Sequence, residues 1–166
     1  MIAQNTQRGR AFIEDRQNIT QGDALDAKIS AGQLRNVTQL VAPTSNLGLI
    51  SGSIDFVLLA QTLHDYYNSD PESARALLRS LFTLVREGGI VGIIDHVGVL
   101  GFDNISLHRM LPQQAIELAL EVGFDVTVSD LLRNDTDEPS RAIFDPRLAR
   151  NTDRFLLRLV KPETEL

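Results

Sequence analysis

Two short, nearly continuous apolar segments constrain the fold of this chain more than any other feature. Residues 54–60 (IDFVLLA) and 90–94 (IVGII) are each bounded by polar or glycine-containing sequence. Such segments are typical of strands in a parallel sheet that helices cover on both faces. Between them, Asp70 is positioned to cap a helix that starts at Pro71 and ends before Gly88. The sequence therefore predicts a strand–helix–strand unit of an α/β protein.

The rest of the chain contains further predicted elements of both kinds. A second helix is expected over 112–122, between Pro112 and Gly123, and a polar, weakly amphipathic helix over 8–17. Strands are expected over three further segments: 36–42, 124–132 and 154–160. The charged segment 133–153 is long for a loop, which favours a lid, a hairpin excursion or a disordered segment.

Length and composition place the chain among soluble globular proteins of one domain. It has 166 residues, 43% of them hydrophobic, and a net charge of -6 with a pI near 5.0. This acidic balance argues against a nucleic-acid partner. No apolar run approaches the ~20 residues that span a bilayer, and residues 1–10 lack the apolar core of a signal peptide, so a cytoplasmic protein without a membrane partner is expected. With no cysteine, thiolate chemistry is excluded.

All three histidines lie near the ends of predicted strands. His64 follows the first apolar segment, His96 follows the second, and His108 precedes the helix at 112. Ligands of open α/β sheets bind beyond the carboxyl ends of the strands, and histidine changes charge near neutral pH. The clustering therefore favours proton transfer or ligation, although any single loop histidine is more often exposed or caps a helix.

Two aspartates stand beside these histidines. Asp65 and Asp95 could orient an imidazole and raise its basicity, or bind a cation. Two histidines and a carboxylate could form a facial metal site, but no HxH, HxxxH or HxxE spacing supports it, so no metal is predicted. Arg109, next to His108, could bind an anionic group because guanidinium matches a carboxylate with two hydrogen bonds.

The motifs resemble those of a known enzyme family. SGSIDFVLLAQTLHD (51–65), LVREGGIVGIIDH (84–96) and EVGFDV (121–126) resemble the second half of class I S-adenosylmethionine (SAM)-dependent methyltransferases. More narrowly, IIDH, LHRM, LLRNDTDEPSRAIFDP and NTDRFLLRLVKP resemble a little-characterised bacterial branch of predicted methyltransferases. The resemblance implies an α/β, Rossmann-like, doubly wound and mostly parallel sheet. Its last strand is antiparallel, between the fifth and sixth.

The chain departs from this family at its N-terminus. The first strand, the glycine-rich loop and the first helix of the family have no counterpart, and residues 1–5 look like the second strand. The expectation is a single domain over 1–166 that is an N-terminally incomplete methyltransferase domain. The edge of segment 54–60 would then be exposed and prone to pair with another chain. Alternatively, residues 1–42 close up against that strand.

The resemblance also implies roles for individual residues. His64, Asp65, Asp95, His96 and His108 would orient or deprotonate the methyl acceptor, and Arg109 would bind any anionic group on it. The residues implied in binding SAM are Asn5, Ala42, Pro43, Thr44, Ala60, Gln61, Thr62 and Leu63.

Three functional hypotheses follow. The first is methyl transfer from SAM to an unknown, small acceptor. The alternative is a catalytically inactive methyltransferase-like module that self-associates, or binds a partner, through an exposed sheet edge. A third, with less support, is a histidine–carboxylate metal hydrolase.

Overall fold

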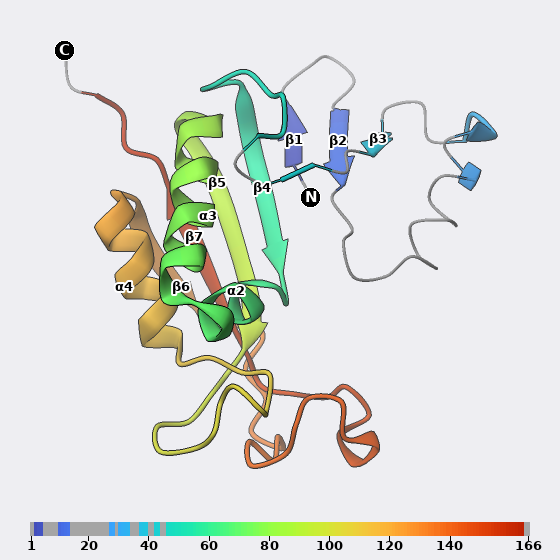
Figure 1. The fold of residues 1–166 in the computed structure, drawn as a ribbon, viewed down its shortest axis with the longest axis vertical. Coiled ribbons are helices and arrows are strands. Elements are labelled where there is room, and N and C mark those ends of the chain that lie inside the picture. Colours follow the sequence, from blue (N-terminus) through green and yellow to red (C-terminus); the bar gives the residue numbers. More distant parts are fainter. Residues whose placement is uncertain are drawn as a thin grey trace.

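The structure, a computed structural model, describes residues 2–4, 10–13, 27–28, 30–33, 37–39, 42–43 and 46–164. Within them lies a seven-stranded sheet with the order β3-β2-β1-β4-β5-β7-β6 (Figure 1). The strands are β1 (Ile2–Gln4), β2 (Arg10–Ile13), β3 (Val37–Gln39), β4 (Ile54–Ala60), β5 (Val85–His96), β6 (Asp125–Ser129) and β7 (Arg154–Val160). The helices are α2 (Leu63–Ser69), α3 (Pro71–Leu84) and α4 (Pro112–Val122), with a short 3-10 helix at Pro146–Leu148.

The sheet is mostly parallel, as the sequence predicts. β4 and β5 are parallel neighbours, whereas β7 lies antiparallel between β5 and β6. Since β2 and β3 also run with β4, only β1 and β7 oppose the other described strands. The insertion of the last strand between the fifth and sixth is confirmed.

β1 occupies the sheet position beside β4. Ile2 pairs with Val57 and Ala3 with Phe56, in an antiparallel register. The N-terminal segment therefore packs against β4, which is the alternative arrangement stated above. Residues 2–4 do not take the position of the family's second strand. Only five residues separate β1 from β2. A parallel connection needs a dozen or more, so these two strands pair antiparallel.

The predicted helix over 8–17 is wrong, because residues 10–13 form strand β2. This strand pairs with β1 on one side and β3 on the other. The amphipathic pattern over 8–17 is weak, so the local preference for a helix is small. Hydrogen bonds to strand partners on both sides of residues 10–13 outweigh that preference.

α3 begins where the sequence places it. The Asp70 side chain accepts a hydrogen bond from the backbone N–H of Glu72, and Pro71 is the first helical residue. α4 spans the predicted residues, and Gly123 follows it in the left-handed conformation, with φ of 107°. The short helix α2 between β4 and α3 was not predicted. None of the described helices is long and apolar enough to cross a membrane.

α3 and α4 lie on the same face of the sheet (Figure 1). α3 connects β4 to β5 and α4 connects β5 to β6, so both crossovers advance across the sheet in the same direction. Right-handed crossovers that advance in one direction place their helices on the same face of the sheet. Strand side chains alternate accordingly: Phe155, Leu157 and Leu159 of β7 are buried, whereas Leu156 is half-buried and Arg158 exposed. The main core consists of the buried stripe of α3, Ala74, Leu77, Leu78 and Leu81, together with apolar residues of β4, β5, β7 and α4.

Gly88 and Gly89 lie inside β5 rather than in a turn before it. Pairing between β4 and β5 jumps here from Ile54–Val85 to Phe56–Ile90, so extra residues bulge from β5. Gly88 has φ of 68°. A Cβ on Gly89 would stand 2.7 Å from the Arg86 carbonyl oxygen and 3.2 Å from that of Ile54. The bulge therefore requires a residue without a side chain.

We expect Gly89→Ala to lower the free energy of unfolding by about 1–3 kcal/mol, because backbone atoms must move to admit the methyl group. The control is Gly92→Ala in the same strand, where the added Cβ would meet only side-chain atoms at 3.5 Å or more. That variant should keep or slightly raise stability. Urea denaturation of both variants measures the difference, and equal midpoints would contradict the prediction.

Candidate functional site

The residues that follow β4 meet the end of β5 because of the strand register. Ala60 pairs with Ile94, and the backbone N–H of Gln61 donates to the Ile94 carbonyl at 2.7 Å. The first turn of α2 therefore lies against Asp95 and His96. Both histidine-bearing segments reach the same end of the sheet, as the sequence predicts for parallel strands.

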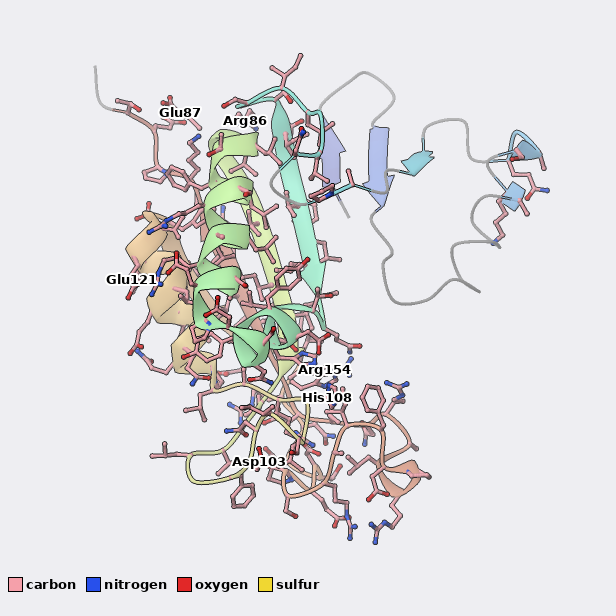
Figure 2. The ribbon with its side chains drawn as sticks, viewed as in Figure 1. Arg86, Glu87, Asp103, His108, Glu121 and Arg154 are labelled. Atoms are coloured by element: carbon pink, nitrogen blue, oxygen red, sulfur yellow. The ribbon has the colours of Figure 1, made fainter. Side chains whose placement is uncertain are left out.

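A loop brings the third histidine to this end. After β5 the chain runs through residues 97–111 and returns, forming a bridge between Val97 and Met110. The Gly98 N–H donates to the Met110 carbonyl at 2.7 Å, and the Met110 N–H to that of His96 at 3.2 Å. Figure 2 shows His108 at the same end of the sheet as Arg154, opposite to the end with Arg86 and Glu87.

Asp95 is the fully buried centre of the site. Its carboxylate lies 2.6 Å from His64 Nδ1 and accepts hydrogen bonds from the backbone N–H groups of His64 at 2.9 Å and His96 at 2.8 Å. Burial by itself lowers the pKa of His64, but the hydrogen bond and charge of Asp95 outweigh it, and the pKa is raised. Asp95 thus fixes the orientation of the His64 ring, and its own carboxylate is inaccessible to solvent.

His96 lies behind His64 and is only 3% exposed. The two rings meet edge to face with centroids 5.7 Å apart, and His96 Nδ1 lies 2.7 Å from Thr152 Oγ1. Burial lowers the pKa of His96 to about 4, so the ring is neutral near pH 7. Its Nε2 is buried without a hydrogen-bond partner among the described residues.

Three side chains face one another at the accessible side of the site. Asp65 Oδ1 lies 3.2 Å from His64 Nε2 and 3.5 Å from His108 Nδ1. The side chains of Asp65 and His108 are 27% and 44% exposed, whereas that of His64 is 3% exposed. We call these residues the His64–Asp65–His108 cluster.

The backbone is strained at one residue of the cluster and at one residue shortly before it. Gln61 has φ of 54° and His108 has φ of 53°, values that side chains other than glycine seldom adopt. Such a conformation costs of order 1 kcal/mol or more and persists where surrounding contacts impose it, often at functional sites. At His108 those contacts include the ring of Phe144, whose centroid lies 4.9 Å away.

Arg109 is not placed to bind a substrate, contrary to expectation. Its side chain is 0% exposed and forms a two-pronged ion pair with Asp137, at 2.6 and 3.0 Å. It also donates to the carbonyls of Val97 and Arg141. A small anion cannot reach a guanidinium buried in this way, so its function is to join the 97–111 loop to the 133–153 segment.

The 133–153 segment is anchored over the same end of the sheet. Asp137 accepts from the Asp153 backbone N–H at 2.9 Å, and the Val97 N–H donates to the Asp153 carbonyl. This segment supplies Thr152 to His96, and Asp137 to Arg109. Sequence reasoning missed both residues; the only signal was the density of acidic and hydroxyl side chains in NDTDEP and NTDR.

The residues expected to bind SAM lie in several environments. Ala60 and Gln61 are exposed at the end of β4, and Thr62 is half-buried. Leu63 is 0% exposed and belongs to the core, which removes its side chain from any cofactor contact. Ala42 is half-buried and Pro43 exposed, whereas Asn5 and Thr44 lie outside the described residues.

A separate hollow of about 250 Å³ lies near the other end of β4. It is lined by the residues before β4 and by the C-terminal part of α3, including Leu47, Ser80 and Thr83. None of the residues that line it is titratable. It therefore offers no acid–base or metal chemistry.

Comparison with known proteins gives a fold but no sequence family. No family model matches the chain, and no curated protein does. Among solved structures, the [4+2]-cyclase SpnF is similar with a TM-score of 0.69 and 16% identity, over 93% of this chain and 67% of that one. The SAM-dependent methyltransferase SibL is similar with a TM-score of 0.63 and 19% identity, over 93% of this chain and 44% of that one.

A third neighbour is phosphoethanolamine N-methyltransferase 2 of Haemonchus contortus, solved with S-adenosyl-L-methionine. It gives a TM-score of 0.61 and 15% identity, over 92% of this chain and 43% of that one. The chain thus spans less than half the length of two of these three neighbours. At these identities the likeness shows the fold alone.

The buried Arg109–Asp137 pair generates a stability prediction. Asp137→Asn should lower the free energy of unfolding by roughly 3 kcal/mol, because it leaves a buried guanidinium without a counter-charge. The control is Asp135→Asn two residues away, on an exposed side chain, which should change stability by at most about 0.5 kcal/mol. Urea denaturation at neutral pH checks both, and similar losses in the two variants would refute the assignment.

The same pair predicts how stability depends on pH. Burial raises the pKa of Asp137, but hydrogen bonds from Arg109 and the Asp153 N–H outweigh it and hold the pKa below its ordinary value. The carboxylate therefore stabilises the fold fully above the unfolded-state pKa of ~3.9, and this contribution is lost as pH falls through the folded-state pKa. The stability difference between wild type and Asp137→Asn, measured from about pH 6 to pH 3, should shrink on acidification. A constant difference would contradict this.

Proposed function

We propose that this chain, which has the class I methyltransferase fold, transfers a methyl group from SAM to a small acceptor. The observation that carries the proposal is the His64–Asp65–His108 cluster at the carboxyl ends of β4 and β5, held in place by buried Asp95. In open α/β sheets this is the edge at which ligands bind. The neighbours with this fold are mostly SAM-dependent methyltransferases, one of them solved with the cofactor.

The donor would lie against the exposed end of β4. Ala60 and Gln61 are accessible there, and Gln61 takes a left-handed conformation that turns the chain toward α2. The small side chain of Ala60 leaves room for a ligand next to the backbone. This placement sets the donor beside the cluster, since His64 is four residues further along the chain.

In the transfer, the bond between the sulfonium sulfur and the methyl carbon breaks as a bond forms from the acceptor atom to that carbon. An acceptor that starts as O–H or N–H also loses a proton. Asp65 and His108, the accessible members of the cluster, would orient the acceptor and take up this proton. Alignment of the two reactants supplies much of the rate in such a reaction. Asp95 and His96 act by positioning the His64 ring.

The surroundings of the cluster favour an acceptor with an apolar body. Phe144 packs on His108 and is 54% exposed, and Ile105 on the same loop as His108 is 62% exposed. The Arg150 guanidinium lies 4.8 Å from the centre of the Phe144 ring. Apolar side chains next to a polar cluster are the usual composition of a small-molecule site.

An alternative is an inactive module that binds another chain through a sheet edge. β1 covers part of the edge of β4, so the sheet edges available for pairing among the described strands are those of β3 and β6. In β6, Val128 is 53% exposed. The absence of a GxGxxG motif from the 166 residues also favours this alternative. One structural neighbour, from Haloferax volcanii, was solved in complex with a methyltransferase activator.

Calorimetric titration of SAM into the 166-residue chain tests the proposal. We expect micromolar binding, equivalent to ~8 kcal/mol. Ala60→Arg should weaken it at least tenfold, or ~1.4 kcal/mol, by filling the donor site. The control is Ile50→Arg, at another exposed position, before the other end of β4, which should bind as wild type does.

Two outcomes would overturn the proposal. One is a folded chain that shows no SAM binding, and the other is binding that Ala60→Arg leaves unchanged. If sedimentation under the same conditions also shows concentration-dependent self-association, the edge-pairing module becomes the better description.

A further inference from the structure

We propose that His64 Nε2, Asp65 Oδ1 and His108 Nδ1 bind one first-row divalent transition-metal ion. Each residue contributes one ligand atom, and these atoms all lie within 4.8 Å of one another. Two ligands are consecutive residues in the first turn of α2, and the third comes from the 97–111 loop. The proposal does not depend on methyl transfer, because the site is defined by these side chains alone. With the ion bound, the ion would replace Asp65 and His108 in orienting the acceptor and lowering the pKa of its proton.

The two spacings that involve Asp65 match those of a metal site, and the two imidazole nitrogens lie within 4.8 Å of each other. Nitrogen and oxygen ligands lie ~2.0–2.2 Å from zinc, so two ligands of a tetrahedral ion are roughly 3.3–3.5 Å apart. Asp65 Oδ1 lies 3.2 Å from His64 Nε2 and 3.5 Å from His108 Nδ1. His108 is the most exposed of the three, so its ring has room to adjust toward an ion.

Asp95 provides independent support from the far side of the His64 ring. Its fully buried carboxylate lies 2.6 Å from His64 Nδ1, and it also accepts the His64 backbone N–H. With a proton on Nδ1 donated to Asp95, the Nε2 lone pair points at the Asp65 carboxylate. Carboxylate–histidine–metal chains in proteins have this arrangement, in which the buried acid fixes the tautomer and raises the basicity of the ligand.

The contact between His64 Nε2 and the Asp65 carboxylate is favourable only with a proton or a metal ion between the two atoms. A nitrogen lone pair facing a carboxylate oxygen at 3.2 Å is repulsive, and either a proton or a metal ion on Nε2 would remove the repulsion. A second acceptor–acceptor contact is possible between Asp65 and His108 at 3.5 Å. One metal ion would satisfy both contacts at once; without it, each ring has to direct an N–H at Asp65, from Nε2 of His64 and from Nδ1 of His108.

The ligand set favours a particular class of metal. Two imidazoles and one carboxylate suit zinc, iron, cobalt or nickel, whereas magnesium and calcium prefer oxygen ligands only. Three protein ligands leave at least one coordination position, and Asp65 and His108 are partly exposed. The open position therefore faces solvent and could bind water or an oxygen atom of a small molecule, as in catalytic rather than structural sites.

The test is metal binding by the chain after dialysis against a chelator, without SAM. Calorimetric titration with Zn²⁺ alone should give one site per chain with micromolar or tighter affinity, and Mg²⁺ alone should give none. Co²⁺ alone should produce visible absorption bands of a four- or five-coordinate ion. The readouts do not involve turnover, so their failure is distinguishable from failure of the proposed function.

Variants connect the binding to these residues. His108→Ala, on an exposed loop side chain, should weaken Zn²⁺ binding at least tenfold and remove the Co²⁺ bands, and so should Asp65→Asn. Asp95→Asn should weaken binding 10- to 100-fold, the usual effect of removing a partner of a ligand. Circular dichroism verifies that each variant is folded. The control is Asp125→Asn, on an exposed carboxylate of β6 far from the cluster, which should bind as wild type does.

The proposal is overturned if the folded chain does not bind Zn²⁺, or if His108→Ala and Asp65→Asn bind it as tightly as wild type. It is also overturned if Mg²⁺ binds the cluster as well as Zn²⁺ does. In the first case the cluster is a proton-sharing network, and NMR titration of the imidazole resonances would then show protonated rings.

Discussion

The carboxylate of Asp95 is the interaction on which the functional end of the molecule depends. It lies at the end of a central strand, is fully buried, and accepts hydrogen bonds from the backbone of both His64 and His96 as well as contacting the His64 ring. A buried charge is costly unless it is paired and hydrogen-bonded. The packing of the start of α2 against the end of β5 provides these hydrogen bonds. The same contacts therefore fix the geometry of the site and stabilise the fold around it.

A second buried charge pair organises the loops around this centre. Arg109 and Asp137 join the 97–111 loop to the 133–153 segment, and the same segment supplies Thr152 to His96. Arg109 directly follows His108 in the chain, so the ion pair also fixes the position of His108 at the edge of the cluster. Loops positioned in this way by a rigid scaffold commonly carry the binding residues of α/β proteins.

Local signals in the sequence were sufficient for most elements from β4 to β7, although α2 and the first residues of β5 were missed. Strand β4, helix α4 and strand β7 have the predicted bounds, because apolar runs and Pro or Gly at helix ends are strong local signals. They were insufficient near the N-terminus, where residues 10–13 form a strand through pairing with distant segments. The shared position of the three histidines was predictable because parallel strands end at one edge. The burial of Arg109 was not, since its partner lies 28 residues away in a segment without a regular pattern.

The sequence by itself determined the strand–helix–strand unit, the antiparallel last strand implied by resemblance, and the gathering of His64, His96 and His108 at one end of the sheet. The strand–helix–strand unit depends on the period of apolar residues and on signals at the helix ends. The antiparallel last strand was implied only by the resemblance, and the gathering of the histidines follows because parallel strands end at one edge of a sheet. Only the tertiary structure decided which histidines are accessible, that His96 is buried against Thr152, and that Asp65 stands between two imidazoles. Those outcomes depend on loop closure and strand register, which bring residues far apart in the chain within hydrogen-bonding distance.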